Sequence, residues 1–241
     1  MIHTTNIPKE LTVGGYVLHT PTAITVSFDE IRYAISTGAL NGGIHHVLAV
    51  RNQHLGFFVE SEKELPGGSL NGYLTAEFEQ DDFPPNFCTG LITSATMERA
   101  AYAKVTAGTT IIEVIATAGF EVTAHRAGDG YKYEETQGHF QAPGTINLLI
   151  FTNKALTDGA LTRAVITATE AKTLALQEAG VTMLNSDLLA SGTATDGLIL
   201  TIDTNGEILT DTGSFSLFGD TLAKAVRQAL AQAIRNAQAT E

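Results

Sequence analysis

Residues 146–180 read INLLIFTNKALTDGALTRAVITATEAKTLALQEAG. The run from Ile146 to Phe151 is continuously apolar, which predicts a buried strand. Thr157 can cap a helix that follows it, and Gly180 can end that helix in a left-handed conformation, with Val181 as the usual hydrophobic contact. One face of this helix stays apolar over about five turns and consists of Leu161, Ala164, Val165, Ala168, Ala171, Ala175 and Ala179.

Shorter patterns on both sides of this stretch predict further elements. β-Prone runs occupy residues 16–18, 23–26, 33–35, 110–116 and 198–202, and apolar spacing predicts helices over residues 95–105 and 222–234. Residues 60–87 are rich in proline, glycine and acids, so we expect an irregular surface excursion that could act as a lid. Residues 90–98 resemble residues 164–170, which leaves an internally duplicated unit and chance similarity as equal alternatives.

The interleaving of these elements indicates the fold class. We predict an α+β, or mixed α/β, fold in which a mixed, largely antiparallel sheet, or two sheets, packs in layers against helices. Because no Pro/Ser-rich linker or low-complexity run divides the chain, we expect a single domain over residues 1–241.

The composition argues against several kinds of partner. The formal net charge is −12 and the 14 basic residues are scattered, so we expect no nucleic acid partner. The apolar runs are far shorter than the ~20 residues of a membrane span. The single cysteine cannot form an internal disulfide, and the first residues lack the pattern of a signal peptide. We therefore expect a cytoplasmic protein that does not enter membranes, and the sequence leaves a homo-oligomer open.

Familiar catalytic signatures are missing from the sequence. It contains no Walker-type loop, no Gly-x-Gly-x-x-Gly, no His-Glu-x-x-His and no Gly-x-Ser-x-Gly. Cys88 lies in an apolar setting that is typical of a buried thiol. The spacing of His125, Asp129, Glu134 and His139 matches no known metal site, so we predict no metal and no cofactor.

Two polar features have open interpretations. The loops at residues 144–147 and 191–196 expose N–H and hydroxyl groups that can hold an amide, carboxylate or phosphate oxygen, but ordinary turns explain them equally well. Thr167 and Glu170 fit a capping box if a helix begins there. If the helix begins at Thr157 instead, Glu170 and Lys172 lie in its middle, and a charge beside the apolar stripe must be solvated, paired or used.

Seven segments together resemble the adenosylcobinamide amidohydrolase family. The most specific combination is TATEAKTLAL (167–176) with ASGTATD (190–196). Shorter matches follow in the family order: LNGG (40–43), TGLIT (89–93), ATAG (116–119), RAGD (126–129) and GTIN (144–147). The resemblance covers roughly residues 30–235.

This resemblance implies a function in corrinoid salvage. Enzymes of the family hydrolyse the amide between a propionyl side chain of the corrin ring and aminopropanol, which converts adenosylcobinamide into adenosylcobyric acid. On this basis we assign Glu170 as general acid or base, Lys172 as its electrostatic partner and Asp196 as an orienting group. The expected substrate contacts are Asn41, Gly42, Gly43, Thr145, Asn147, Thr169, Thr193 and Thr195.

Two departures from the family pattern bear on activity. Ala194 replaces the middle glycine of Gly-Thr-Gly-Thr-Asp, and Ser214-Phe215 replaces an expected Lys-His pair before the last helix. These departures leave two alternatives open, a non-catalytic corrinoid-binding relative and a hydrolase of a different small amide.

Overall fold

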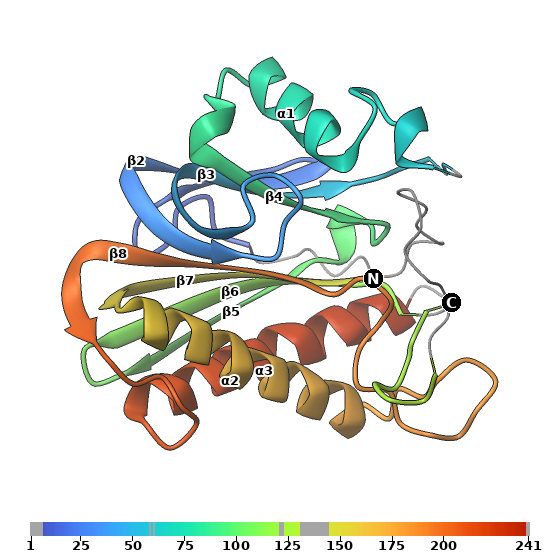
Figure 1. The fold of residues 1–241 in the computed structure, drawn as a ribbon. Coiled ribbons are helices and arrows are strands. Elements are labelled where there is room, and N and C mark those ends of the chain that lie inside the picture. Colours follow the sequence, from blue (N-terminus) through green and yellow to red (C-terminus); the bar gives the residue numbers. More distant parts are fainter. Residues whose placement is uncertain (1–6, 58, 60, 121–122, 131–144, 240–241) are drawn as a thin grey trace.

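The computed structural model describes residues 7–57, 59, 61–120, 123–130 and 145–239 (Figure 1). Its strands are β1 (Tyr16–His19), β2 (Ala23–Ser36), β3 (Gly43–His54), β4 (Cys88–Thr93), β5 (Ala101–Ala107), β6 (Thr110–Ala118), β7 (Ile146–Leu156) and β8 (Gly197–Leu209). Its helices are α1 (Leu70–Gln80), α2 (Asp158–Glu178) and α3 (Leu217–Gln238), with 3-10 turns η1 (Glu62–Glu64), η2 (Pro85–Phe87) and η3 (Met97–Arg99).

The strands form a mixed sheet in the order β4-β3-β2-β8-β7-β6-β5, and β1 pairs with β2. The pairs β3/β4 and β7/β8 are parallel, whereas the other pairs among the described residues are antiparallel. In each parallel pair a helix connects the two strands, as parallel neighbours require. The predicted mixed, largely antiparallel sheet is thus confirmed.

The sheet is bent into two layers, so that β2, β3 and β4 lie over β8, β7, β6 and β5 (Figure 1). Side chains of β7 alternate between two cores, as the period of two in a strand requires. Leu149 and Phe151 pack between the two layers with Val50 of β3. Leu148 and Ile150 face α2 and α3, which cover the outer side of this half of the sheet. Helix α1 lies on the opposite outer side.

Helix α2 begins and ends as its sequence predicts. The Thr157 hydroxyl accepts from the Ala160 N–H at 3.3 Å, and Gly180 adopts a φ of +67° directly after the C-cap. The helix is unbroken from Asp158 to Glu178, so the alternative of a capping box at Thr167 is wrong. Thr167 is buried instead, and its hydroxyl donates to the carbonyl of Thr212 at 2.9 Å. No helix in the described ranges has the length and apolarity to cross a bilayer.

The prediction of a helix over residues 95–105 is wrong. Residues 95–105 form η3 and most of β5 rather than a helix, because pairing with β6 outweighs the helical spacing of their small apolar residues. Of the two resembling segments, residues 90–98 lie in β4 and the turns after it, whereas residues 164–170 lie in the middle of α2. These two segments are therefore not equivalent parts of a duplicated unit. The chain nevertheless repeats the order strand, strand, helix, strand in β2-β3-α1-β4 and in β6-β7-α2-β8.

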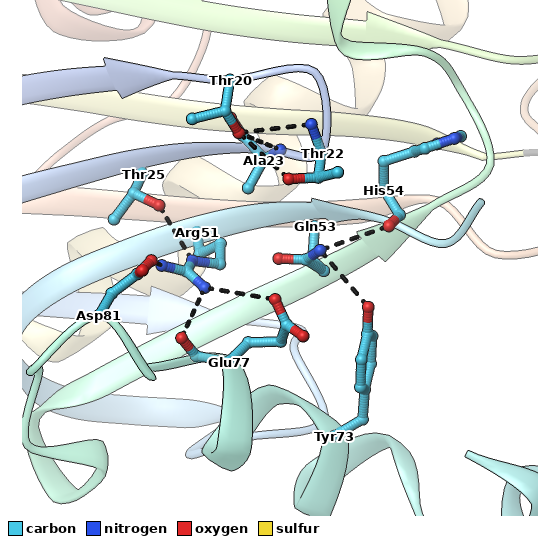
Figure 2. A network of polar contacts seen from close by, with 10 residues as sticks. All are labelled: Thr20, Thr22, Ala23, Thr25, Arg51, Gln53, His54, Tyr73, Glu77 and Asp81. Atoms are coloured by element: carbon cyan, nitrogen blue, oxygen red, sulfur yellow. Dashed lines mark hydrogen bonds and ion pairs between the residues drawn. The ribbon is translucent and has the colours of Figure 1, made fainter. Parts of the chain in front are cut away.

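The excursion at residues 60–87 is more regular than expected, because it contains α1. Figure 2 shows the contacts that hold this helix on β3. The buried guanidinium of Arg51 donates to the Glu77 carbonyl at 3.0 Å, forms an ion pair with Asp81, and lies 4.7 Å from the centre of the Phe78 ring. Gln53 donates to the Tyr73 hydroxyl at 3.4 Å. These contacts fix the position of α1, whose residues also line the pocket described next.

Candidate active site

A pocket of about 240 Å³ lies beside β4, where the two layers of the sheet and α1 meet. Six parts of the chain line it, and they are separated in the sequence. The lining residues are Thr37, Gly38 and Ala39 after β2; Leu55 after β3; Leu70 and Leu74 of α1; Gly90 to Ser94; and Thr145, Asn147, Thr195, Asp196 and Gly197 at the start of β7 and β8.

Buried amide and hydroxyl side chains form the polar floor of this pocket. Asn147 is 1% exposed and donates to Asn52 Oδ1 at 2.7 Å and to the carbonyl oxygen of Ile92 at 3.1 Å. Asn52 in turn donates to Thr117 Oγ1 at 2.9 Å. The Thr145 hydroxyl donates to the carbonyl of Thr195. Because both N–H groups of Asn147 have protein partners, its side chain ties the two layers together beneath the pocket.

Asp196 is the ionisable side chain among the described lining residues, and it is held from three directions. Its Oδ1 accepts from the Thr193 hydroxyl at 2.5 Å, from the Thr193 N–H at 3.1 Å and from the Ile146 N–H at 3.3 Å. Its Oδ2 forms an ion pair with Lys172 of α2. The two side chains are only 17% and 12% exposed, so solvent screens the pair less than it screens a surface ion pair.

The structure thus brings together six of the residues predicted from the sequence. Thr145, Asn147, Thr195 and Asp196 line the pocket, and Lys172 and Thr193 contact Asp196.

Five other predicted residues lie elsewhere. Glu170 and Thr169 are exposed on α2, where the Thr169 hydroxyl donates back to the Val165 carbonyl. Asn41 has a φ of +48° and donates to the carbonyls of Pro85 and Cys88, both at 2.8 Å. Asn41 therefore joins a loop to the start of β4. Neither it nor Gly42 nor Gly43 lines the pocket.

Several lining residues were missed by the sequence analysis. Gly90 to Thr93 belong to a segment that matches the family, but their apolar neighbours gave no reason to assign them a binding role. Ser94, directly after β4, and residues 37–39, directly after β2, carry no recognisable motif. Their position at strand ends beside a parallel crossover is the signal that could have identified them.

The sequence singled out two further sets of residues: the candidate metal ligands and the residues that depart from the family pattern. No group of three or more metal-ligating side chains is found among the described residues, and Glu134 and His139 lie outside them. Ala194 is exposed next to the Asp196 cluster. Ser214 and Phe215 lie beyond the C-terminal end of β8, whereas the pocket is at its N-terminal end, and the Phe215 side chain is fully exposed.

Burial changes the chemistry of the single cysteine. Cys88 is fully buried, and desolvation raises the pKa of its thiol to about 12. A thiol with this pKa is almost entirely protonated at neutral pH and is a poor nucleophile. This agrees with the prediction of a structural role for Cys88.

Comparisons with known proteins add a family assignment to this geometry. An uncharacterized protein of Methanocaldococcus jannaschii is 34% identical over an alignment of 245 positions, which covers 95% of this chain and 91% of that protein. Among solved structures, a Burkholderia sp. β-aminopeptidase is similar with a TM-score of 0.48 and 13% identity, covering 89% of this chain and 79% of its own. A Pyrococcus horikoshii OT3 protein has a TM-score of 0.44 and 12% identity, covering 98% and 83%. The family model for adenosylcobinamide amidohydrolase matches residues 5–241. The chain therefore belongs to the adenosylcobinamide amidohydrolase family.

Proposed function

We propose that this chain hydrolyses the amide between a corrinoid propionyl side chain and aminopropanol, and so converts adenosylcobinamide into adenosylcobyric acid for cobamide salvage. The family assignment supports an amide hydrolase in general. The observation that carries the specific proposal is the convergence of family-matching segments. Residues 89–93, 144–147 and 190–196 are distant in sequence, yet members of all three line one pocket.

The reaction needs a base, a stabilised oxyanion and an acid for the leaving amine. We assign the proton transfers to Asp196. Among the described residues, its Oδ1 has three donors and its Oδ2 has Lys172, and a carboxylate offers about four acceptor positions. The remaining position on Oδ2 accepts a proton from the attacking water. The same proton passes to the amine nitrogen as the C–N bond breaks, which leaves a carboxylic acid and aminopropanol. The acid proton then passes to the released amine, so that the final products are a carboxylate and an ammonium ion.

Lys172 is a positioning residue in this proposal. Its ammonium group forms an ion pair with Asp196 Oδ2 and so holds that oxygen in place. Glu170, the acid or base expected from the resemblance, is exposed and does not line the pocket. Its catalytic role stays a prediction without support from its position.

The test is incubation of the purified chain with adenosylcobinamide, followed by chromatographic detection of adenosylcobyric acid. Asp196→Asn should lower kcat by about a hundredfold or more, because the carboxamide cannot accept the proton. Lys172→Met should lower kcat more than it changes KM, because the ion pair holds the reacting carboxylate in place. Lys224→Met is the matched control, since Lys224 forms an exposed ion pair with Asp220 on α3.

The outcomes separate the proposal from its alternatives. Absence of both product and corrinoid binding would reject the proposed function. Binding without product would favour a non-catalytic relative. Loss of activity after exhaustive chelation would contradict a metal-free reaction.

A further inference from the structure

The pocket exposes one side of an edge strand. β4 pairs with β3 on one side, and on the other side an isolated bridge joins Gly90 to Leu40, so among the described residues this edge is open only beyond Gly90. The residues of β4 alternate in direction, as in any parallel ladder. The Thr93 carbonyl accepts from the Leu55 N–H and so points toward β3. The Ile92 carbonyl accepts from Asn147 Nδ2 and so points the other way, toward the start of β7. In a parallel strand the N–H and C=O of one residue point to the same side, so the Ile92 N–H is directed at the pocket.

Ser94 adds a second donor at this edge. It follows β4 directly and lines the pocket. Within the described part of the chain, no hydrogen bond engages its hydroxyl. An Ile92 N–H and a Ser94 hydroxyl along one open strand edge form an arrangement that can hold the carbonyl of an extended amide, as strand edges hold peptides.

The size of the pocket limits what can enter it. Pockets that enclose drug-sized ligands have volumes of about 300–1,000 Å³, whereas this one has about 240 Å³. A corrin ring is larger than a drug-sized ligand, so it exceeds the volume that the described lining residues enclose. A short acyl chain and a small amine can, and Leu55, Leu70 and Leu74 provide an apolar wall for their methylene groups.

We propose that only the amide-bearing arm of the substrate enters the pocket, extended along the open edge of β4, while the ring stays outside. The carbonyl oxygen accepts from the Ile92 N–H and the Ser94 hydroxyl. The substrate class of the site is therefore short secondary amides of small hydroxyalkyl amines, with or without a macrocycle attached. The hydroxyalkyl amine and the corrinoid identity of the natural substrate rest on the proposed function, whereas the small size of the bound group rests on the pocket.

The test uses N-(2-hydroxypropyl)propanamide as the probe. Saturation-transfer NMR should detect its binding to the full chain, and the probe should compete with adenosylcobinamide. Ser94→Ala should weaken binding of the probe about tenfold, which is the effect of losing one hydrogen bond. Ala39→Phe should abolish binding, because Ala39 is an exposed residue of the pocket lining. Ala76→Phe is the matched control, since Ala76 is exposed on α1 outside the lining. Circular dichroism checks that each variant is folded.

The possible results distinguish the two proposals. Hydrolysis of adenosylcobinamide without binding of the probe would overturn the arm-only inference and leave the proposed function standing. Binding that Ala39→Phe abolishes, without hydrolysis of adenosylcobinamide, would support the inference and reject the proposed function. Binding that Ala39→Phe leaves unchanged would place the probe elsewhere and overturn the inference.

Discussion

At the scale of single residues, the Asp196–Lys172 pair depends on the glycine beside it. A Cβ on Gly192 would lie 2.4 Å from Asp196 Oδ2 and 2.6 Å from Lys172 Nζ. These distances are below van der Waals contact, so a methyl group there forces the ion pair apart. The resemblance identified the loop as important, but only the three-dimensional packing explains why its second residue has no side chain.

Gly192→Ala should therefore lower kcat by at least tenfold and destabilise the fold by about 1–3 kcal/mol. Steady-state hydrolysis and urea unfolding measure the two effects. Gly159→Ala is the control, because nothing lies within 4 Å of a Cβ at Gly159 in the first turn of α2. Equal activity of Gly192→Ala and wild type would contradict a role for the ion pair geometry.

Cys88 links a single buried group to the pH dependence of stability. Burial raises the pKa of its thiol from 9.0 to about 12, so the folded state keeps a proton that the unfolded chain loses. The resulting stability is fully present below pH 9 and is lost as the pH rises from 9 toward 12, by up to about 1.4 kcal/mol per pH unit. Urea unfolding at pH 8 and pH 10.5 should show a smaller loss for Cys88→Ala than for wild type; identical losses would refute this origin.

At the scale of secondary structure, α2 separates two residues that the family motif places together. A helix turns about 100° per residue, so side chains two positions apart point about 200° apart. Lys172 faces the Asp196 cluster and Glu170 is exposed. The sequence shows the order of the residues in the motif. Which of them are buried and which are exposed depends on α2 being continuous through Thr167.

Glu170→Gln should accordingly retain kcat/KM within about twofold, because no described pocket residue contacts it and exposed positions tolerate substitution. The same steady-state assay measures this, with Asp196→Asn as the inactive reference. A loss of a hundredfold would restore Glu170 as the catalytic acid or base and would require a different arrangement in solution.

At the scale of the whole molecule, the length of β8 separates Ser214 and Phe215, which depart from the family pattern, from the pocket. Gly197 at the first position of β8 lines the pocket, and Ser214 and Phe215 follow its last position, Leu209. A strand of 13 residues spans about 40 Å at ~3.3 Å per residue. The loss of the expected basic pair therefore does not alter the pocket of this chain.

The double variant with Ser214→Lys and Phe215→His should change kcat/KM for adenosylcobinamide by less than about twofold, since both positions are remote from the reacting amide. Ala194→Gly, in contrast, alters the loop next to Asp196 and is the informative comparison. A clear gain of activity in the double variant would show that a second copy of the chain or the bound ring reaches this loop.

The sequence by itself determined the elements whose signals are local. The cap at Thr157, the stop at Gly180 and the apolar run at Ile146 fixed β7 and α2, because capping and burial patterns act within a few residues. The bend that stacks β2–β4 on β7 and β8, the edge position of β4 and the burial of Arg51 under α1 were decided only by the tertiary structure. They depend on pairings between residues far apart in the sequence, such as Asn52 with Asn147 and, across 169 positions, Tyr33 with Ile202. No local propensity encodes such pairings, and they are what turn separate polar loops into one pocket.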